Sequence, residues 1–434
     1  MNGFPSIPRA ARRTTELLAA LIIWSAALLP VVATAAEPGQ PTHDWPQFLG
    51  PHRNGISDET GLLDRWPTDG PRPVWRVPGG VGMSGLVISR GQVITLVQKD
   101  GQQWALALEA GTGTVQWQTP LAPAYRNGMG NGPRSTPAVS GDLVFVFTGD
   151  GILSALNLAD GKPVWSHNAV TDYKGQVAEY GMACSPLVVG KLVIVTVGAP
   201  QAAVVAYDAK SGKLVWQAGN DPAGYSSPAL LDVGGRRQLV AYTGASVLGL
   251  APETGAALWR HPYATNFDCN IATPLAVNGR VFVSSGENHG CVLLGLKPQG
   301  DRFAVEEVWS SQGTKSVLRN EWQTSILHEG HLYGFDNVGA AGPVTHLTCI
   351  NAQSGERVWQ KLRFGKGNLI AADGKLWLST INGELVVARL TTAGYEELGR
   401  MPVLKATRQA PAIANGRLYL RDDQEIICLD VRQP

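Results

Sequence analysis

Side chains that could bind a charged or aromatic ligand recur in this sequence shortly before a predicted inner strand, in most cases before a Ser-Pro, Thr-Pro or Ala-Pro step. The candidates are Arg134, Tyr180, Tyr225, Asn270, Trp322 and Arg408. Arginine pairs with anionic oxygens through charge-assisted hydrogen bonds, and aromatic rings stack on flat groups in largely apolar pockets. If the fold gathers these loops, we expect a binding site for a polar ligand. The alternative is that these side chains only satisfy backbone groups and water.

Four acidic residues lie in the same stretches and could support catalysis or hold a metal. They are Glu179, Asp221, Asp268 and Glu321. Two carboxylates about 5 to 9.5 Å apart would suit glycoside hydrolysis, and several converging oxygens would suit calcium. Their spacing along the chain shows no shared pattern that would bring them together. A carbohydrate-active protein is therefore a third alternative, behind a binding protein and an oxidoreductase.

Other reactive motifs are sparse. His328-x-x-His331 is the only close histidine pair, and it flanks a predicted hairpin tip where two rings need not converge on zinc. The chain contains no Gly-x-Ser-x-Gly phrase, so nothing marks a serine nucleophile. Of the five cysteines, Cys269 and Cys291 flank one predicted hairpin and are the pair to test for a disulfide. We expect no metal site.

The elements that must position these residues are revealed by an internal repeat. A glycine followed four residues later by tryptophan occurs five times, at Gly113, Gly161, Gly212, Gly255 and Gly355. Most of these glycines follow an apolar run that ends in an acidic or amide residue. Such a residue can bond the backbone across a turn, while glycine adopts the positive φ that the reversal requires. Each unit therefore reads as short strands joined by tight turns.

The tryptophan spacing gives the size of the unit. Tryptophans at 75, 117, 165, 216, 259, 309 and 359 are 42 to 51 residues apart. Periods of about 40 to 50 residues with four strands each indicate β-propeller blades. A seventh repeat has Leu398 in the tryptophan position, and three further strands follow it. We expect the repeated tryptophans to pack between neighbouring blades.

Pairing the strand around Trp75 with the three C-terminal strands would complete one more blade. The prediction is an all-β, eight-bladed propeller over residues 73–434, made of four-stranded antiparallel blades and closed by this N-terminal strand. Closure leaves no open sheet edge for aggregation. Residues 36–72 are rich in proline and glycine, and we expect them to lie across one face of the propeller.

The N-terminus predicts export. Residues 1–35 combine three arginines, an apolar run and small residues before Ala36, which is typical of a cleaved signal peptide. An uncleaved membrane anchor is the alternative. Without these residues the net charge falls from +1 to about −1, so charge gives no reason to bind nucleic acid. We expect a protein of the periplasm or cell envelope that is not embedded in the membrane after cleavage, with secretion as the alternative.

The phrase Ala-Leu-x-x-x-x-Gly-x-x-x-Trp, as at Ala155 to Trp165, resembles the repeat of pyrroloquinoline-quinone (PQQ) propellers. It is similar to quinoprotein alcohol dehydrogenases and to the outer-membrane assembly lipoprotein family, which shares the repeat without the cofactor. The opening Asp44-Trp-Pro-Gln-Phe-Leu-Gly-Pro51 looks like exported bacterial propellers of unknown activity. The dehydrogenase resemblance implies PQQ, calcium, an aspartate base, a stacking tryptophan and usually two adjacent cysteines. The sequence has no adjacent cysteine pair.

We therefore expect an exported, non-catalytic propeller that presents one face to a protein or small-molecule ligand. No cofactor is expected. The alternative is a PQQ-dependent dehydrogenase in which PQQ and calcium occupy the channel mouth beside the six candidate residues.

Overall fold

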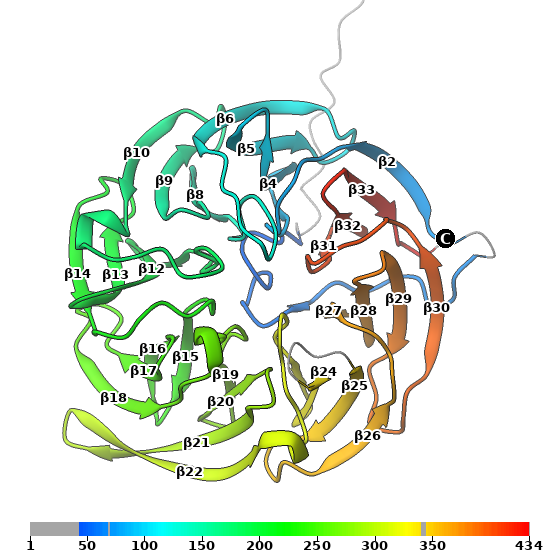
Figure 1. Cartoon of the computed structure of the whole chain (residues 1–434). Coiled ribbons are helices and arrows are strands. Elements are labelled where there is room, and N and C mark those ends of the chain that lie inside the picture. Colours follow the sequence, from blue (N-terminus) through cyan, green and yellow to red (C-terminus); the bar gives the residue numbers. More distant parts are fainter. Residues whose placement is uncertain (1–42, 68–69, 340–343, 434) are drawn as a thin grey trace, which may run out of the picture. The chain divides into compact units, whose positions relative to one another are not determined.

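The repeats fold into eight antiparallel sheets arranged around a central axis, as the sequence predicts (Figure 1). The structure is a computed structural model that describes residues 43–67, 70–339 and 344–433. The expected signal peptide, residues 1–35, lies outside the described residues. Within the described ranges, no helix has the length and apolar character needed to cross a membrane.

The first four blades each contain four consecutive strands, which follow one another from the channel outward (Figure 1). Blade 1 has β3 (Val87–Ser89), β4 (Gln92–Lys99), β5 (Gln102–Glu109) and β6 (Val115–Pro123), and blade 2 has β7 (Ala138–Ser140), β8 (Leu143–Phe147), β9 (Ile152–Asn157) and β10 (Pro163–Asn168). Blade 3 has β11 (Leu187–Val189), β12 (Leu192–Ala199), β13 (Ala202–Asp208) and β14 (Leu214–Ala218), and blade 4 has β15 (Ala229–Val233), β16 (Arg236–Tyr242), β17 (Ser246–Leu250) and β18 (Ala257–Pro262).

The remaining blades repeat this order, and short 3-10 turns precede or follow some of them. Blade 5 has β19 (Leu275–Val277), β20 (Arg280–Ser285), β21 (Gly290–Gln299) and β22 (Arg302–Gln312), and blade 6 has β23 (Ile326–His328), β24 (His331–Val338), β25 (Val344–Asn351) and β26 (Arg357–Lys361). Blade 7 has β27 (Gly367–Ala372), β28 (Lys375–Thr380), β29 (Glu384–Arg389) and β30 (Glu397–Pro402), and blade 8 has β31 (Ala412–Ala414), β32 (Arg417–Arg421), β33 (Glu425–Asp430) and β2 (Arg72–Pro78). The 3-10 turns are η1 (Thr171–Tyr173), η2 (Asn266–Asp268) and η3 (Gly313–Lys315).

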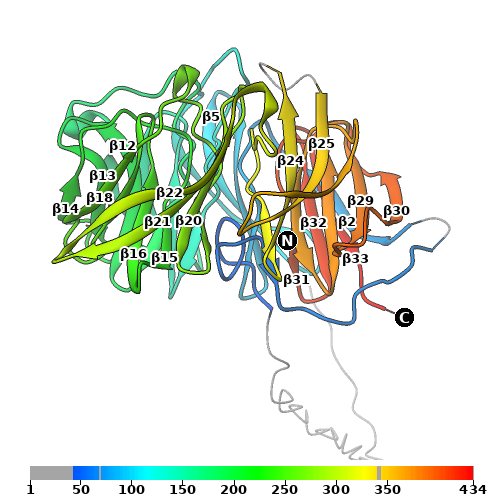
Figure 2. The ribbon, with the colours of Figure 1, turned by 90° about the horizontal axis from the view of Figure 1, so that it is seen from below.

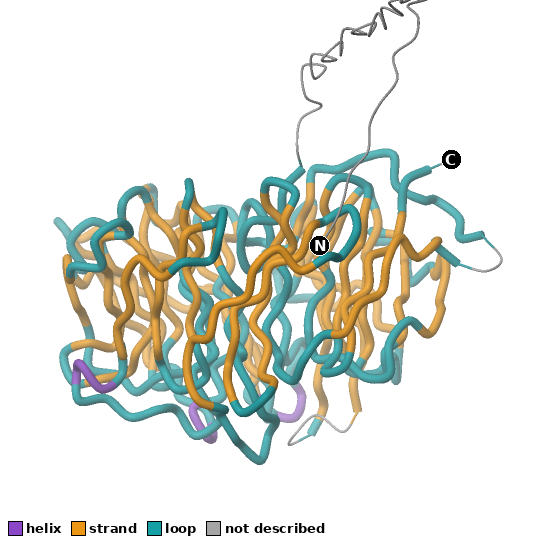
Figure 3. The backbone as a smooth tube through the Cα atoms, turned by 90° about the horizontal axis from the view of Figure 1, so that it is seen from above, coloured by secondary structure: helices purple, strands orange, loops and turns teal. Residues whose placement is uncertain are grey.

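The ring closes as predicted. β2 pairs antiparallel with β33, and the register places Trp75 opposite Cys428 and Pro78 opposite Glu425. The N-terminal strand therefore completes the C-terminal blade, and the two ends of the propeller are held together by a sheet. Figure 3 shows the strands spanning the thickness of the ring, with loops gathered at its two faces.

The repeated tryptophans hold neighbouring blades together, which confirms their predicted structural role. Six indole Nε1–H groups donate to a backbone carbonyl of the following blade, at distances of 2.9 to 3.2 Å. The pairs are Trp75–Ala110, Trp117–Leu158, Trp165–Ala209, Trp216–Pro252, Trp309–Ala352 and Trp359–Thr391. The seventh, Trp259, instead donates to Gln238 of its own blade.

The recurring spacing of glycine and tryptophan has a packing reason at the turn on which each indole lies. Gly113 has a φ of +76°, and a Cβ there would lie 2.8 Å from Cδ2 of Trp75. Only glycine combines this backbone conformation with an indole lying directly on the turn. The glycine of one blade and the tryptophan of the preceding blade therefore act as a pair.

The tryptophan position of blade 7 differs from the sequence prediction. In blade 1, Ala107 is opposite Trp117, whereas in blade 7 the matching residue Val387 is opposite Gly399 and Leu398 falls in the bulge. Leu398 is therefore not in the tryptophan position, because the turn between the two outer strands is two residues longer than in blade 1. The half-buried indole of Trp66, from the N-terminal segment, lies where a Gly399 side chain would be, with Cδ2 2.5 Å from the ideal Cβ position.

The N-terminal segment, residues 43–67, follows one face of the ring (Figure 2). Trp45 forms an antiparallel bridge with Ile88 of blade 1, and the carbonyl of Pro46 accepts from Val139 of blade 2 at 2.8 Å. Further along, β1 (Ile56–Ser57) joins β27 as a fifth, parallel strand of blade 7. The segment thus crosses the channel from one side of the ring to the other.

Candidate binding site in the central channel

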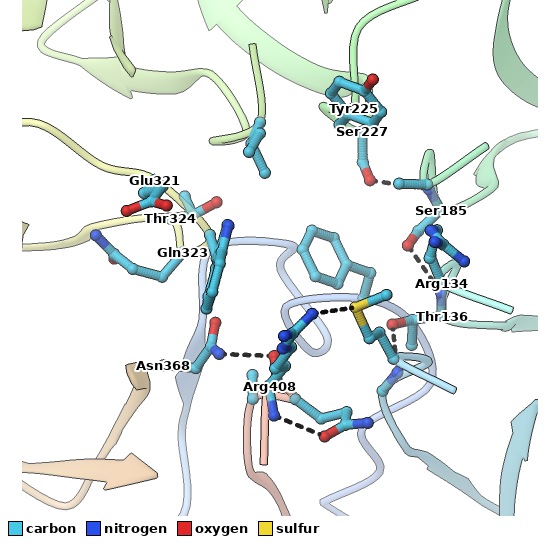
Figure 4. A pocket seen from close by; sticks show the side chains of 18 of the residues that line it. Arg134, Thr136, Ser185, Tyr225, Ser227, Glu321, Gln323, Thr324, Asn368 and Arg408 are labelled. Atoms are coloured by element: carbon cyan, nitrogen blue, oxygen red, sulfur yellow. Dashed lines mark hydrogen bonds between the residues drawn. The ribbon is translucent and has the colours of Figure 1, made fainter. Parts of the chain in front are cut away.

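A cavity of about 690 Å³ occupies the central channel. Arg134, Tyr180, Tyr225, Trp322 and Arg408 all line it, so the structure brings together five of the six residues predicted from sequence. They come from the loops that lead into the innermost strands of different blades. Figure 4 shows Arg134, Tyr225 and Arg408 at the pocket. Because those loops begin every blade on the same face, the repeat itself gathers them at one end of the channel.

The other end of the cavity is formed by the N-terminal segment. Trp45, Phe48 and Leu49 are among the lining residues. The segment bonds to Pro186, within a Ser-Pro step, and to Val139, just after a Thr-Pro step, whereas the predicted candidates precede those steps. The segment therefore closes the floor of the cavity, opposite the loops that form its rim.

A buried arginine fastens this floor to the ring. The guanidinium of Arg53 donates to the carbonyls of Ser185 at 2.7 Å, Pro186 at 3.2 Å and Pro228 at 2.8 Å. Its bonded partners in the described chain include no carboxylate. Burial lowers the pKa of Arg53 to about 10, which still leaves it charged at neutral pH. A positive charge is therefore held beneath the cavity.

Hydroxyl groups of the Ser/Thr steps line the cavity between floor and rim and link adjacent blades. The backbone N–H of Thr136 donates to Ser185 Oγ at 3.0 Å, and that of Ser185 donates to Ser227 Oγ at 2.9 Å. Thr136 Oγ1 and Thr324 Oγ1 accept in the same way from Gly85 and Thr273, each at 3.0 Å. These serines and threonines are therefore used to satisfy the backbone at the blade junctions, besides facing the channel.

One side of the rim is a stack of cations on tryptophan. Lys366 Nζ lies 4.3 Å from the ring centroid of Trp322, and the Arg408 guanidinium lies 5.2 Å from it. Lys366 also pairs with the buried carboxylate of Glu321 at 2.9 Å. Burial raises the pKa of Glu321 despite this pairing. Contacts of this kind between a cation and an indole stabilise both groups when they are shielded from water.

Arg134 and Arg408 approach each other on the adjoining part of the rim. Arg134 lies 4.8 Å from the ring centroid of Tyr125 and donates to the carbonyls of Gly132 and Gly130 at 2.5 and 2.6 Å. Arg408 donates to the carbonyl of Met129. Burial, and to a lesser degree the charge of Arg408, lowers the pKa of Arg134. Two guanidinium groups are thus held near each other by backbone carbonyls of one loop.

Aromatic rings form the part of the rim that adjoins Arg134. Tyr180 and Tyr225 stack with centroids 5.7 Å apart, and Phe267 lies 6.4 Å from Tyr180. The phenol oxygen of Tyr225 accepts from the backbone N–H of Tyr180 at 3.2 Å. Burial raises the pKa of Tyr225, so this hydroxyl stays protonated at neutral pH. Phe267 remains 59% exposed and presents an apolar surface at the mouth.

Asn270 does not face the cavity. Its amide nitrogen donates to the carbonyls of Thr243 at 2.6 Å and Tyr263 at 2.9 Å, and its side chain is fully buried. The sequence places Asn270 in the correct loop, but the amide points into the wall and satisfies backbone groups there. For Asn270, the alternative that the candidate side chains only satisfy backbone groups describes the observed contacts.

The four acidic candidates do not form one cluster. Of them, only Glu321 lines the cavity. Asp221 accepts from Thr243 at 2.7 Å and pairs with Arg260 at 3.1 Å, away from the channel. Glu179 and Asp268 are not among the lining residues, and the charge of Glu179 adds to burial in raising the pKa of Asp268. The described residues contain no group of three or more His, Cys, Asp or Glu side chains that could hold a metal.

The cavity does not fit the calcium and quinone pair of the dehydrogenase alternative. Calcium requires several oxygen ligands, whereas the carboxylate of Glu321 is paired with Lys366. The indole of Trp322 already has Lys366 over it. These contacts occupy the groups that the resemblance would assign to a metal and a stacked quinone.

The two cysteines considered for a disulfide are free thiols in this structure. Cys269 lines the cavity, while Cys291 is buried within β21. Burial, with neighbouring carboxylates, raises the pKa of Cys269 to about 12. His328 and His331 lie on either side of the hairpin tip, and His331 Nδ1 is 2.9 Å from the carbonyl oxygen of Glu329.

Several lining residues were not identified from the sequence. Lys366, Phe267 and Phe48 are among them. Lys366 precedes a strand that lacks the Ser/Thr-Pro step, so the repeat pattern does not mark it as a residue of an entry loop. Phe48 reaches the channel only because the N-terminal segment crosses it, and no local sequence pattern carries that information.

Comparison with known proteins connects this geometry to a family. The family model described as outer membrane protein assembly factor BamB matches residues 65–185 and 101–361. Curated relatives of that name include one from Nitrosomonas eutropha, 29% identical over 39% of this chain and 38% of the relative. Another, from Yersinia pestis, is 23% identical over 66% of this chain and 71% of the relative. The chain therefore spans well under half of the first relative.

Solved structures agree on the architecture. A quinohemoprotein alcohol dehydrogenase from Comamonas testosteroni superposes with a TM-score of 0.63 at 14% identity, covering 90% of this chain and 81% of that structure. At this identity the likeness concerns the fold alone. The contacts within the channel, rather than the ring, must therefore decide between a binding protein and a dehydrogenase.

Proposed function

The chain belongs to the family described as outer membrane protein assembly factor BamB, and from this premise we propose that it is a non-catalytic binding scaffold of the cell envelope. Its recognition surface is the channel-mouth face, where Phe267, Met129, Arg134 and Arg408 surround the cavity. The partner is a protein or another ligand of the envelope. The proposed location extends the compartment indicated by the names of the relatives and agrees with the expected signal peptide.

One observation carries this proposal. The side chains that a catalytic or metal site would use are already bonded to other groups, while the mouth of the cavity exposes side chains that can contact a partner. Glu321 is paired with Lys366, and Trp322 lies beneath Lys366 and Arg408. In contrast, Phe267 and Met129 remain 59% and 43% exposed. Exposed apolar side chains beside cationic and aromatic groups are typical of recognition surfaces.

Site-specific photocrosslinking tests the proposal in cells that express the full chain. A benzoylphenylalanine at position 267 reports on the mouth, and one at Val115, which is 56% exposed on an outer strand, is the matched control. We expect a discrete adduct with an envelope component at position 267 alone, reduced when excess unlabelled protein competes. Equal adducts at both positions, or no adduct at position 267, would contradict a recognition role for this face.

A separate titration tests the absence of catalysis. Purified full chain is titrated with pyrroloquinoline quinone, with and without calcium, and then assayed for dye reduction with alcohols and sugars. We expect neither calcium-dependent binding nor dye reduction. Saturable, calcium-dependent binding with substrate-dependent reduction would restore the dehydrogenase alternative.

A further inference from the structure

We propose that the channel cavity binds a small organic monoanion whose charged end pairs with Arg134 and Arg408 and whose flat or elongated apolar body fills the cavity below. This inference rests on the proposed function in assuming that the mouth face is the side from which ligands arrive. It adds the chemistry of the ligand and the orientation in which it binds.

The anionic end is specified by two guanidinium groups that lie near each other. Their side-chain partners in the described chain are backbone carbonyls, for Arg134 those of Gly130 and Gly132 and for Arg408 that of Met129, together with the neutral sulfur of Met83 at 3.8 Å from Arg408. Neighbouring guanidinium groups without a bonded carboxylate repel each other, and an anion between them removes that repulsion. The buried charge of Arg53 beneath the floor adds to the same positive potential.

The residues that line the interior of the cavity specify the apolar body of the ligand. Below the rim the lining residues are mainly hydrophobic, and they include Trp45, Phe48, Leu49, Leu86 and Ile370. A volume of about 690 Å³ lies within the range of small-molecule pockets, which bury most of the ligand against apolar walls. The floor segment prevents the cavity from being an open passage, so a ligand that enters can lose its hydration water.

Hydroxyl groups add donors partway down. Ser185 Oγ and Ser227 Oγ each accept a backbone N–H of the neighbouring blade. Neither hydroxyl has an acceptor for its own hydrogen among the bonds of the described residues. Each can therefore donate toward a polar atom in the channel.

The far side of the rim explains why the ligand carries charge at one end only. Glu287 and Glu321 are among the residues that line the cavity, whereas Glu179 and Asp268 are not. Besides burial, the charges of all four raise the pKa of Cys269, in the loop before blade 5, so each lies close enough to that thiol to act on it. The four carboxylates outnumber the one cation, Lys366, that pairs with Glu321, so a second negative group on the ligand would be repelled there. The mouth therefore selects a monoanion and fixes its orientation.

Calorimetric titration of the full chain with three naphthalene probes tests the inference. Naphthalene-2-carboxylate has one charged end, naphthalene-2-carboxamide is its neutral isostere, and naphthalene-2,6-dicarboxylate carries charge at both ends. We expect saturable binding of the monocarboxylate, with the other two at least tenfold weaker. Equal affinity for the carboxamide, or no binding of any probe, would overturn the proposal without requiring a variant.

Variants then locate the charged end. The double change Arg134→Gln and Arg408→Gln should weaken the monocarboxylate at least tenfold and leave the carboxamide unchanged. Arg389→Gln removes an exposed arginine paired with Glu396 on the outside of blade 7 and serves as the control. Unchanged carboxylate affinity in the double variant would overturn the assignment. Persistence of the crosslink at position 267 in that case would leave the proposed scaffold function standing, so the two failures are distinguishable.

Discussion

Exchange of a glycine and a tryptophan between two segments tests how the N-terminal segment is joined to the ring. Gly399 is in the blade-7 position that tryptophan occupies in other blades, and Trp66 covers it from outside the repeat. Trp66→Ala should destabilise the protein by about 2–3 kcal/mol, below the roughly 3–5 kcal/mol of a fully buried tryptophan because this indole is half-buried.

The reverse change alone should also be harmful. A Cβ at Gly399 would lie 2.5 Å from Cδ2 of Trp66, so Gly399→Trp overpacks the site and should cost about 1–3 kcal/mol. In the double variant the new indole would fill the space that Trp66→Ala leaves. We expect the double variant to be at least about 2 kcal/mol more stable than the sum of the single changes implies, since contacting residues are not additive.

Unfolding midpoints in urea, followed by tryptophan fluorescence and circular dichroism, measure this coupling. Trp104→Ala is the matched control, because Trp104 is also half-buried against the same core but bonds to Lys99 of its own blade. Gly399→Trp should be additive with Trp104→Ala. If Gly399→Trp lowers the midpoint equally with and without Trp66, the two positions do not share one space and the reasoning is refuted.

Three further predictions concern the floor, the blade junctions and the cavity thiol. Arg53→Met should lower the free energy of unfolding by about 3–5 kcal/mol, because three buried carbonyls lose a charged donor, and a urea midpoint equal to that of the exposed control Arg90→Met would contradict this. Trp117→Phe should cost about 1 to 2 kcal/mol through loss of the bond to Leu158 and of some packing, and an unchanged midpoint would show that the indole bond contributes nothing. Cys269 should be recovered as a free thiol by non-reducing peptide mapping. Because its pKa is raised to about 12, the thiolate fraction and hence its alkylation rate should rise about tenfold per pH unit from pH 8 to 10, and a plateau near pH 9 would contradict the raised pKa.

The architecture could be predicted because its signals are local and repeated. Gly113 and Trp117 mark a turn and an outer strand within one unit, and the same spacing recurs around the ring. The eighth blade followed from a strand around Trp75 with no preceding strands of its own. Blade 7 shows the limit of such reasoning: two extra residues in its turn move Leu398 out of register, and only the pairing of Val387 with Gly399 reveals this.

The site could be predicted only as far as the repeat reaches. Arg134 and Tyr180 were found because each precedes an inner strand of a recognisable unit. For Asn270, the loop was predicted but the side-chain direction was not, since its amide is taken by carbonyls in the wall. Phe48 belongs to no repeat, and its position in the channel depends on how the N-terminal segment crosses the ring.

The arrangement of the channel suggests how one ring can serve both binding proteins and enzymes. The hydroxyls of Ser185 and Ser227 accept backbone N–H groups of neighbouring blades, so their loss would disturb the ring as well as the channel. Arg408 and Lys366 bond at the rim instead, to the carbonyl of Met129 and the carboxylate of Glu321, and their exchange leaves the hydroxyl bonds between blades in place. The side chains at the rim, and with them the chemistry of the site, can therefore change while the hydroxyl groups that join neighbouring blades stay in place. In this chain the pairing of Lys366 with Glu321 removes a carboxylate that a bound metal would need, and the same pairing leaves Arg134 and Arg408 as the positive groups at the mouth without a bonded carboxylate.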